Sequence, residues 1–113
     1  MSKGDAVPTR GRELQVEVAN TTSPTTVVLK GEIDLSTSPR VREVLMDIAR
    51  SGEVRVVIDM SQVTFMDSTG LSALVGPLKR FRQNGGHITL RSPTSSVRKI
   101  LEITGLTRVF TIE

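Results

Sequence analysis

Residues 54–71 read V-R-V-V-I-D-M-S-Q-V-T-F-M-D-S-T-G-L, and they carry the features that decide the fold. The nearly continuous apolar run from Val54 to Ile58 predicts a strand that is buried on both faces. After Asp59, a short connection is expected to lead into Asp67-Ser-Thr-Gly70. Apolar residues then recur at helical spacing, which predicts a helix. This stretch therefore reads as one strand, one turn and one helix of an α/β domain.

The rest of the chain continues this alternation on both sides. Runs of serine, threonine and proline near Ser36 and Ser92 predict the starts of two more helices, and glycines mark the helix ends. Alternating or short apolar runs predict four more strands, and the first two are close enough in sequence to pair antiparallel. These strands are expected at 13–18, 27–35, 87–91 and 109–112.

The order β-β-α-β-α-β-α-β predicts an α/β fold. We expect one domain, residues 13–113, with a mixed, mostly parallel five-stranded sheet flanked by helices. Residues 1–12 are predicted to form a flexible N-terminal tail. In the second strand, Leu35 has the same parity as Val27 and Ile33, so it is expected on the same face.

Composition excludes several classes of function. The 113 residues include no cysteine and only one histidine, so thiol chemistry and a nucleophile–base pair are not expected. That histidine, His87, lacks metal-ligand spacing and is expected to be exposed at the start of a strand. The chain has no apolar run near the roughly 20 residues of a membrane span and no signal-peptide core. We therefore expect a cytoplasmic protein with no membrane partner and no metal site.

Basic residues on the second and third helices are predicted to form a solvated face, with an acidic partner as the alternative. The net charge of +3 is small, and no aromatic set is available to stack on bases, so nucleic acid is not an expected partner. A monomer or weak dimer is expected. The basic residues in question are Lys79, Arg80, Arg82, Arg98 and Lys99.

Two aspartates are predicted to meet at one end of the sheet. Asp34 follows the second strand and Asp67 follows the third, and parallel strands end at the same side. Ser68 and Thr69 stand there at a helix N-terminus, where unpaired N–H groups and a partial positive charge tolerate a phosphate. The carboxylates would repel that phosphate or help to bind a magnesium ion beside it. Capping alone also explains Asp, Ser and Thr in such a turn.

The stretch 57–71 resembles the signature of bacterial anti-sigma factor antagonists, the STAS-domain family. Its most specific part is F-M-D-S-T-G-L, residues 65–71, and Gly31-Glu-Ile-Asp34 is similar to the second family signature. Gly85-Gly86 and the segment 97–106 also match. The resemblance extends over about residues 13–113.

The resemblance implies a phosphorylation switch and no enzymatic activity of the chain itself. It implies that a serine-protein kinase, itself an anti-sigma factor, phosphorylates Ser68 with phosphate from ATP, with Thr69 as the weaker candidate. The unphosphorylated form would bind that kinase and release a sigma factor or other regulator. A serine phosphatase, expected to be of the PP2C type, would reverse the switch. No cofactor is expected. The residues expected around the phosphosite are Asp34, Met66, Asp67, Thr69, Gly70 and Leu71.

Two other interpretations stay open. STAS-like chains also serve as non-switching subunits of transport or stress-sensing complexes, which would bind a membrane complex or other STAS chains. A small α/β enzyme could use Asp34, Asp67 and Ser68 as a metal-assisted site, although no base with a suitable pKa is evident.

Pro77 departs from the family pattern. Proline inside a helix removes a backbone hydrogen bond and costs about 3 kcal/mol. Together with Gly76, it predicts a kink or an early break near residues 73–77. Because the partner is expected to contact this helix, Pro77 bears on the choice of partner.

Overall fold

The computed structural model describes residues 14–113, so the predicted tail at 1–12 lies outside the described residues. Five strands form one sheet in the order β1-β2-β3-β4-β5. The β1 strand pairs antiparallel with β2, and every other neighbouring pair is parallel. The predicted fold class, element order and antiparallel first strand are confirmed. The strands are β1 (Gln15–Asn20), β2 (Thr25–Ile33), β3 (Arg55–Met66), β4 (His87–Arg91) and β5 (Thr111–Ile112).

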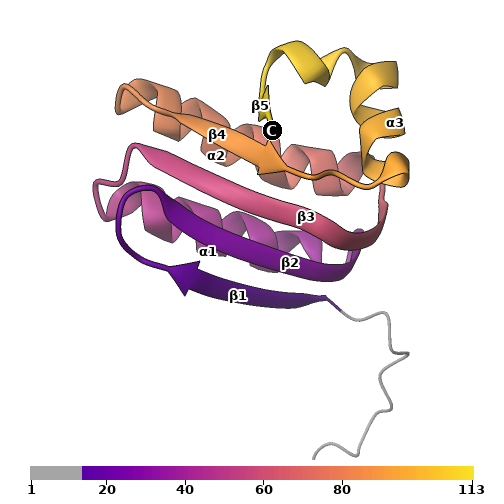
Figure 1. Ribbon diagram of the computed structural model, residues 1–113, viewed down its shortest axis with the longest axis horizontal. Coiled ribbons are helices and arrows are strands. Elements are labelled where there is room, and N and C mark those ends of the chain that lie inside the picture. The colour runs from indigo at the N-terminus through magenta and orange to yellow at the C-terminus, as the bar shows by residue number, and fades with distance from the viewer. Residues whose placement is uncertain (1–13) are drawn as a thin grey trace, which may run out of the picture.

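Three α-helices pack around this sheet. Figure 1 shows α1 and α2 side by side behind the sheet, with α3 beyond the end of β3. A 3₁₀ turn at Leu106–Arg108 follows α3, so the last strand is shorter than predicted. The helices are α1 (Ser38–Arg50), α2 (Ser68–Gln83) and α3 (Ser95–Thr104).

The core lies between the sheet and the pair α1 and α2, and it is aliphatic apart from two phenylalanines. Alternate residues of β2, β3 and β4 face these helices, and each helix contributes one apolar stripe. Burial of this face fixes the strand register, because a slip by one residue would turn every core side chain outward. The largest fully buried side chains include Leu29, Ile33, Leu45, Ile58, Leu74, Phe81 and Ile88.

The third strand is longer than its sequence suggested. The expected short connection after Asp59 is instead a continuation of β3 to Met66. Relative to β2, the strand carries an extra residue at two places, between Asp59 and Gln62 and between Val63 and Phe65. Each bulge shifts the inward-facing position by one residue, so the buried residues Met60, Val63 and Met66 recur every third position. The expected short connection after Asp59 is therefore wrong, because the bulges replace strand alternation with a spacing of three residues.

The helix α2 continues through Pro77, so the predicted early break is wrong. Pro77 is buried on the same face as Ala73, Leu74 and Phe81. Packing of this face offsets the missing backbone hydrogen bond, and the helix runs to Gln83 without interruption.

Candidate functional site

The structure brings Asp34 and Asp67 together at the end of the sheet where β2 and β3 finish, here called the carboxyl end. Ile33 and Met66 are partners in the last register position of β2 and β3. The Asp67 N–H also donates to the Ile33 carbonyl at 3.3 Å. The two aspartates thus directly follow paired residues, as their positions in parallel strands predicted.

Asp67 is the N-cap of α2. Its backbone is extended, and its Oδ1 atom accepts hydrogen bonds from the N–H groups of Thr69 at 3.0 Å and Gly70 at 3.1 Å. The Thr69 hydroxyl donates to the same oxygen at 2.6 Å. Three donors therefore converge on one carboxylate oxygen, which satisfies first-turn N–H groups that have no partner within the helix.

Ser68 is the first residue of α2 and is exposed. Its hydroxyl makes no hydrogen bond with any residue of the described range 14–113, whereas its carbonyl accepts from the Ser72 hydroxyl at 3.1 Å. The two neighbouring hydroxyls thus differ: that of Thr69 is held by the cap, and that of Ser68 is open to solvent.

Asp34 holds the turn between β2 and α1. Its Oδ1 accepts from the Ser36 hydroxyl at 2.9 Å, the Ser36 N–H at 3.0 Å and the Thr37 N–H at 3.2 Å. These bonds stabilise the ionised carboxylate. The Ser36 hydroxyl has the largest effect, and together they hold the pKa of Asp34 below its usual value.

Gly70 is required where α2 meets the sheet. A Cβ atom at this position would lie 2.7 Å from Cγ of Met66, 2.8 Å from Cγ2 of Ile33 and 2.9 Å from the Ile33 carbonyl oxygen. Met66, Gly70 and Leu71 are all buried. They therefore fix the position of the turn, while Ser68 supplies its exposed group.

Two exposed apolar side chains adjoin the aspartates, and the sequence reasoning missed both. Leu35 is 75% exposed in the β2–α1 turn, so its predicted place on the inner face of the strand is wrong. Phe65 is 44% exposed, and it pairs with Glu32 one register position before the carboxyl end. The available signal in the sequence was that Leu35 directly follows Asp34 and that Phe65 directly precedes Met66.

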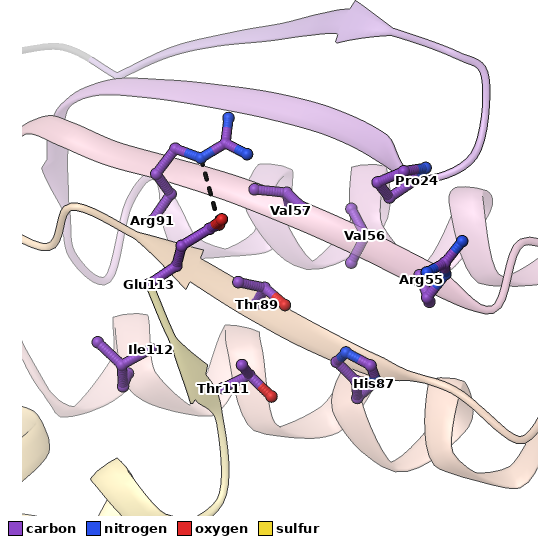
Figure 2. Close-up of a pocket in the computed structure, with 10 residues that line it drawn as sticks. All are labelled: Pro24, Arg55, Val56, Val57, His87, Thr89, Arg91, Thr111, Ile112 and Glu113. Carbon is purple, nitrogen blue, oxygen red and sulfur yellow. Dashed lines mark hydrogen bonds and ion pairs between the residues drawn. The ribbon is translucent and has the colours of Figure 1, made fainter.

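A cavity of about 340 Å³ lies on the sheet face opposite α1 and α2. Figure 2 shows Arg55 and His87 near one end of it and the Arg91–Glu113 ion pair, at 3.3 Å, at the other. His87 is exposed at the start of β4, as predicted. None of the residues predicted to surround the phosphosite lines this cavity.

Neither a metal-binding cluster nor a membrane-spanning helix is found among residues 14–113. Across residues 14–113, no group of three or more His, Cys, Asp or Glu side chains is arranged to hold a metal ion. Among those residues, no helix combines the length and apolar character needed to cross a bilayer. The predicted basic face on α2 and α3 is exposed, and Arg82 donates to the Val109 carbonyl at 2.9 Å.

Comparisons with known proteins decide the family. A family model described as the STAS domain matches residues 14–113. An anti-sigma-B factor antagonist of Staphylococcus epidermidis is 35% identical over 80 residues, which cover 71% of this chain and 74% of that protein. The chain belongs to the anti-sigma factor antagonist family of STAS-domain proteins. The family resemblance predicted from residues 57–71 is confirmed.

Solved structures support the STAS fold. An anti-sigma factor antagonist from Mycobacterium paratuberculosis superposes with a TM-score of 0.80 at 24% identity, over 89% of this chain and 86% of that one. The anti-sigma factor antagonist SpoIIAA in its unphosphorylated form gives 0.71 at 22% identity, over 89% and 88%. The Bacillus SpoIIAA has also been solved in a phosphorylated form, with a TM-score of 0.65 at 22% identity, over 89% and 91%.

Proposed function

We propose that this STAS protein is an anti-sigma factor antagonist in a partner-switching system. In its unphosphorylated form it binds a serine-kinase anti-sigma factor, which then releases a sigma factor or other regulator. Phosphorylation of Ser68 blocks this binding, and a PP2C-type phosphatase restores it. The observation that carries the proposal is the Ser68 hydroxyl, exposed and free of hydrogen bonds within residues 14–113 at the carboxyl end.

The hydrogen bonds favour Ser68 over Thr69 as the phosphoacceptor. A kinase must place the acceptor hydroxyl in line with the γ-phosphate of ATP, and an exposed hydroxyl can enter such a site without rearrangement. The Thr69 hydroxyl is only partly exposed, and it donates to Asp67 at 2.6 Å. Its modification would first break part of the α2 cap.

The position of Ser68 allows a phosphate to change docking while leaving the fold intact. Ser68 is not part of the core, and a helix N-terminus favours negative charge. A phosphoserine adds about −1.5 to −2 charges at neutral pH. This charge would lie close to Asp34 and Asp67. A partner surface that fits the neutral hydroxyl would then clash with the larger phosphoryl group, and burying its charge would carry a strong desolvation cost.

Exposed apolar surface at the carboxyl end supports an interface there. Leu35 and Phe65 are two of the four large hydrophobic side chains that stand out as exposed among residues 14–113. Both adjoin the turns that contain the aspartates. Apolar side chains surrounded by polar residues are typical of the centre of a protein–protein interface. We therefore place the anti-sigma factor against Leu35, Phe65 and the start of α2.

Phosphorylation by the purified anti-sigma kinase of the same organism tests the proposal. Incubation with ATP should add one phosphate, which peptide mass spectrometry should assign to Ser68. The Ser68→Ala variant should stay unmodified and still bind the kinase, whereas Ser68→Asp should bind at least tenfold more weakly by calorimetry. Thr69→Ala is the matched control, because it should still be phosphorylated at Ser68.

Two results would contradict the proposal. One is phosphate on Thr69 in wild-type protein with Ser68 unmodified. The other is equal affinity of Ser68→Asp and wild type for the kinase.

A further inference from the structure

A cavity of about 320 Å³ lies between the first turns of α1 and α2. Both helices begin at the carboxyl end, so the cavity is close to Ser68 without including it. Hydroxyl groups and one guanidinium dominate its polar lining. The lining residues are Ser38, Pro39, Arg42, Thr69, Ser72 and Ala73.

Ser38 supplies a polar group that lacks a partner. It is only 8% exposed, and its hydroxyl makes no hydrogen bond with any residue in the described part of the chain. No fully buried side-chain oxygen or nitrogen in the described part of the chain lacks a hydrogen-bond partner, so the Ser38 hydroxyl oxygen retains some contact with solvent. Because Ser38 lines the cavity, its hydroxyl is available to a group that enters there.

Arg42 supplies an uncommitted positive charge on the same cavity. Its side chain is exposed and forms no ion pair with the residues at 14–113. It lies across α2 at Gly76, where a Cβ atom would be 3.5 Å from the Arg42 Nε atom. The first turns of both helices contain no acidic residue, but the carboxylates of Asp67 and Asp34 accept hydrogen bonds at the starts of α2 and α1, so Arg42 supplies the positive charge of the cavity lining.

We propose that this cavity receives the phosphoryl group carried by Ser68, with Arg42 as its ion-pair partner and the Ser38 hydroxyl as a hydrogen-bond donor. Ser68 lies about 6 Å along the axis of α2 from Ser72, which lines the cavity. Exposed arginines change rotamer on the picosecond to nanosecond scale, so the guanidinium can swing from Gly76 toward the start of α2.

The inference rests on the proposed function and deepens it, because it assigns the phosphorylated state its own binding groups. Guanidinium and phosphate form strong, often bidentate hydrogen bonds. The phosphate is then held on the molecule, and Arg42 is withdrawn from any contact with the partner. The switch thereby changes two surface charges at once.

A phosphoserine installed at position 68 during translation tests this without any kinase. The pKa of the phosphate, read from ³¹P NMR titration of the whole chain, should be about half a unit lower in the wild type than in Arg42→Gln. Arg42→Lys should give an intermediate value. Arg50→Gln, on the same helix but paired with Asp47, is the matched control and should titrate like the wild type. Asp34 and Asp67 are present in every variant, so their effect cancels.

Equal phosphate pKa values in wild type and Arg42→Gln would overturn the inference. A separate arm asks whether the anion comes from Ser68 or from solution, by titrating inorganic phosphate into unmodified protein. Weak, non-saturating shifts of the α1 and α2 amide signals are expected, because the tether supplies the effective concentration. Saturable binding of free phosphate at low millimolar concentration, unchanged in Ser68→Ala, would instead assign the cavity to a free anion. Because the phosphoserine is installed directly, failure here would leave the kinase experiment unaffected.

Discussion

The two strand-to-helix turns at the carboxyl end share a plan but use their hydroxyls differently. In the β2–α1 turn, Asp34 Oδ1 accepts from the N–H and hydroxyl of Ser36, two residues on. In the β3–α2 turn, Asp67 Oδ1 accepts from the N–H and hydroxyl of Thr69, again two residues on. The residue directly after each aspartate is exposed. That residue is Leu35 in the first turn and Ser68 in the second.

The comparison shows that residue type alone does not identify a phosphoacceptor. Both turns contain serine and threonine close to an aspartate, but hydrogen bonding to the carboxylate occupies the hydroxyl at the second position. Ser36 is exposed as well, but its hydroxyl donates to Asp34, and the residue directly after the aspartate carries a hydroxyl only in the β3–α2 turn. The hydrogen bonds of the two turns therefore support the proposal that Ser68 is the phosphoacceptor among five hydroxyl residues. Those residues are Ser36, Thr37, Ser38, Ser68 and Thr69.

The two turns differ most at the third position after the aspartate, and a substitution there should have the largest effect on the free energy of unfolding. The first turn has Thr37 there, whereas the second has Gly70, which lacks room for a side chain. Gly70→Ala should lower the free energy of unfolding by about 2 kcal/mol, because Met66 and Ile33 must shift. Gly76→Ala on the same helix should instead raise it by up to about 1 kcal/mol. Urea denaturation measures both. Equal effects of the two variants would refute the packing argument.

Removing the cap of the second turn should have the next largest effect. Asp67→Ala leaves two first-turn N–H groups without their acceptor and should cost about 1 kcal/mol of unfolding free energy. Asp67→Asn retains a capping oxygen and should cost less. Thermal denaturation followed by circular dichroism distinguishes them. An Asp67→Ala variant as stable as wild type would show that α2 is positioned by packing alone.

The first turn should show a pH dependence that depends on Asp34. Its pKa is lowered in the folded protein, so the ionised carboxylate favours folding above the unfolded value of 3.8. That contribution is lost as the pH falls through the folded pKa, where both states become protonated. The difference in urea midpoint between wild type and Asp34→Asn should therefore shrink as the pH is lowered from about 6 to about 2.5. A difference that stays constant over this range would contradict the assignment.

The smallest expected effects on stability come from removing the hydroxyl of Ser36 or that of Ser68. Ser36→Ala removes a donor to Asp34 and should lower the urea midpoint slightly. Ser68→Ala removes a hydroxyl that is free of hydrogen bonds within residues 14–113, so its midpoint should match wild type. If Ser68→Ala were the more destabilising of the two, Ser68 would have a structural role.

Much of this site could be predicted because it depends on local patterns. Parallel strands place Asp34 and Asp67 at one end, whatever their exact lengths. Two errors arose where a local rule was overridden. Leu35 has strand parity, but the Asp34 turn ends β2 at Ile33 and leaves Leu35 exposed. Pro77 removes a helical hydrogen bond, but its ring is buried on the packed face of α2, and the helix continues.

The order of the elements, the family, and the end of the sheet at which the aspartates meet can all be inferred from the amino-acid sequence. These follow from hydrophobic periodicity, turn residues and the direction of parallel strands, which are properties of short segments. Tertiary structure alone decided the bulged length of β3, the need for glycine at position 70 and the freedom of the Ser68 hydroxyl. Each of these depends on contacts between segments distant in sequence or on the choice among competing hydrogen bonds. Such choices are made only when the chain has packed.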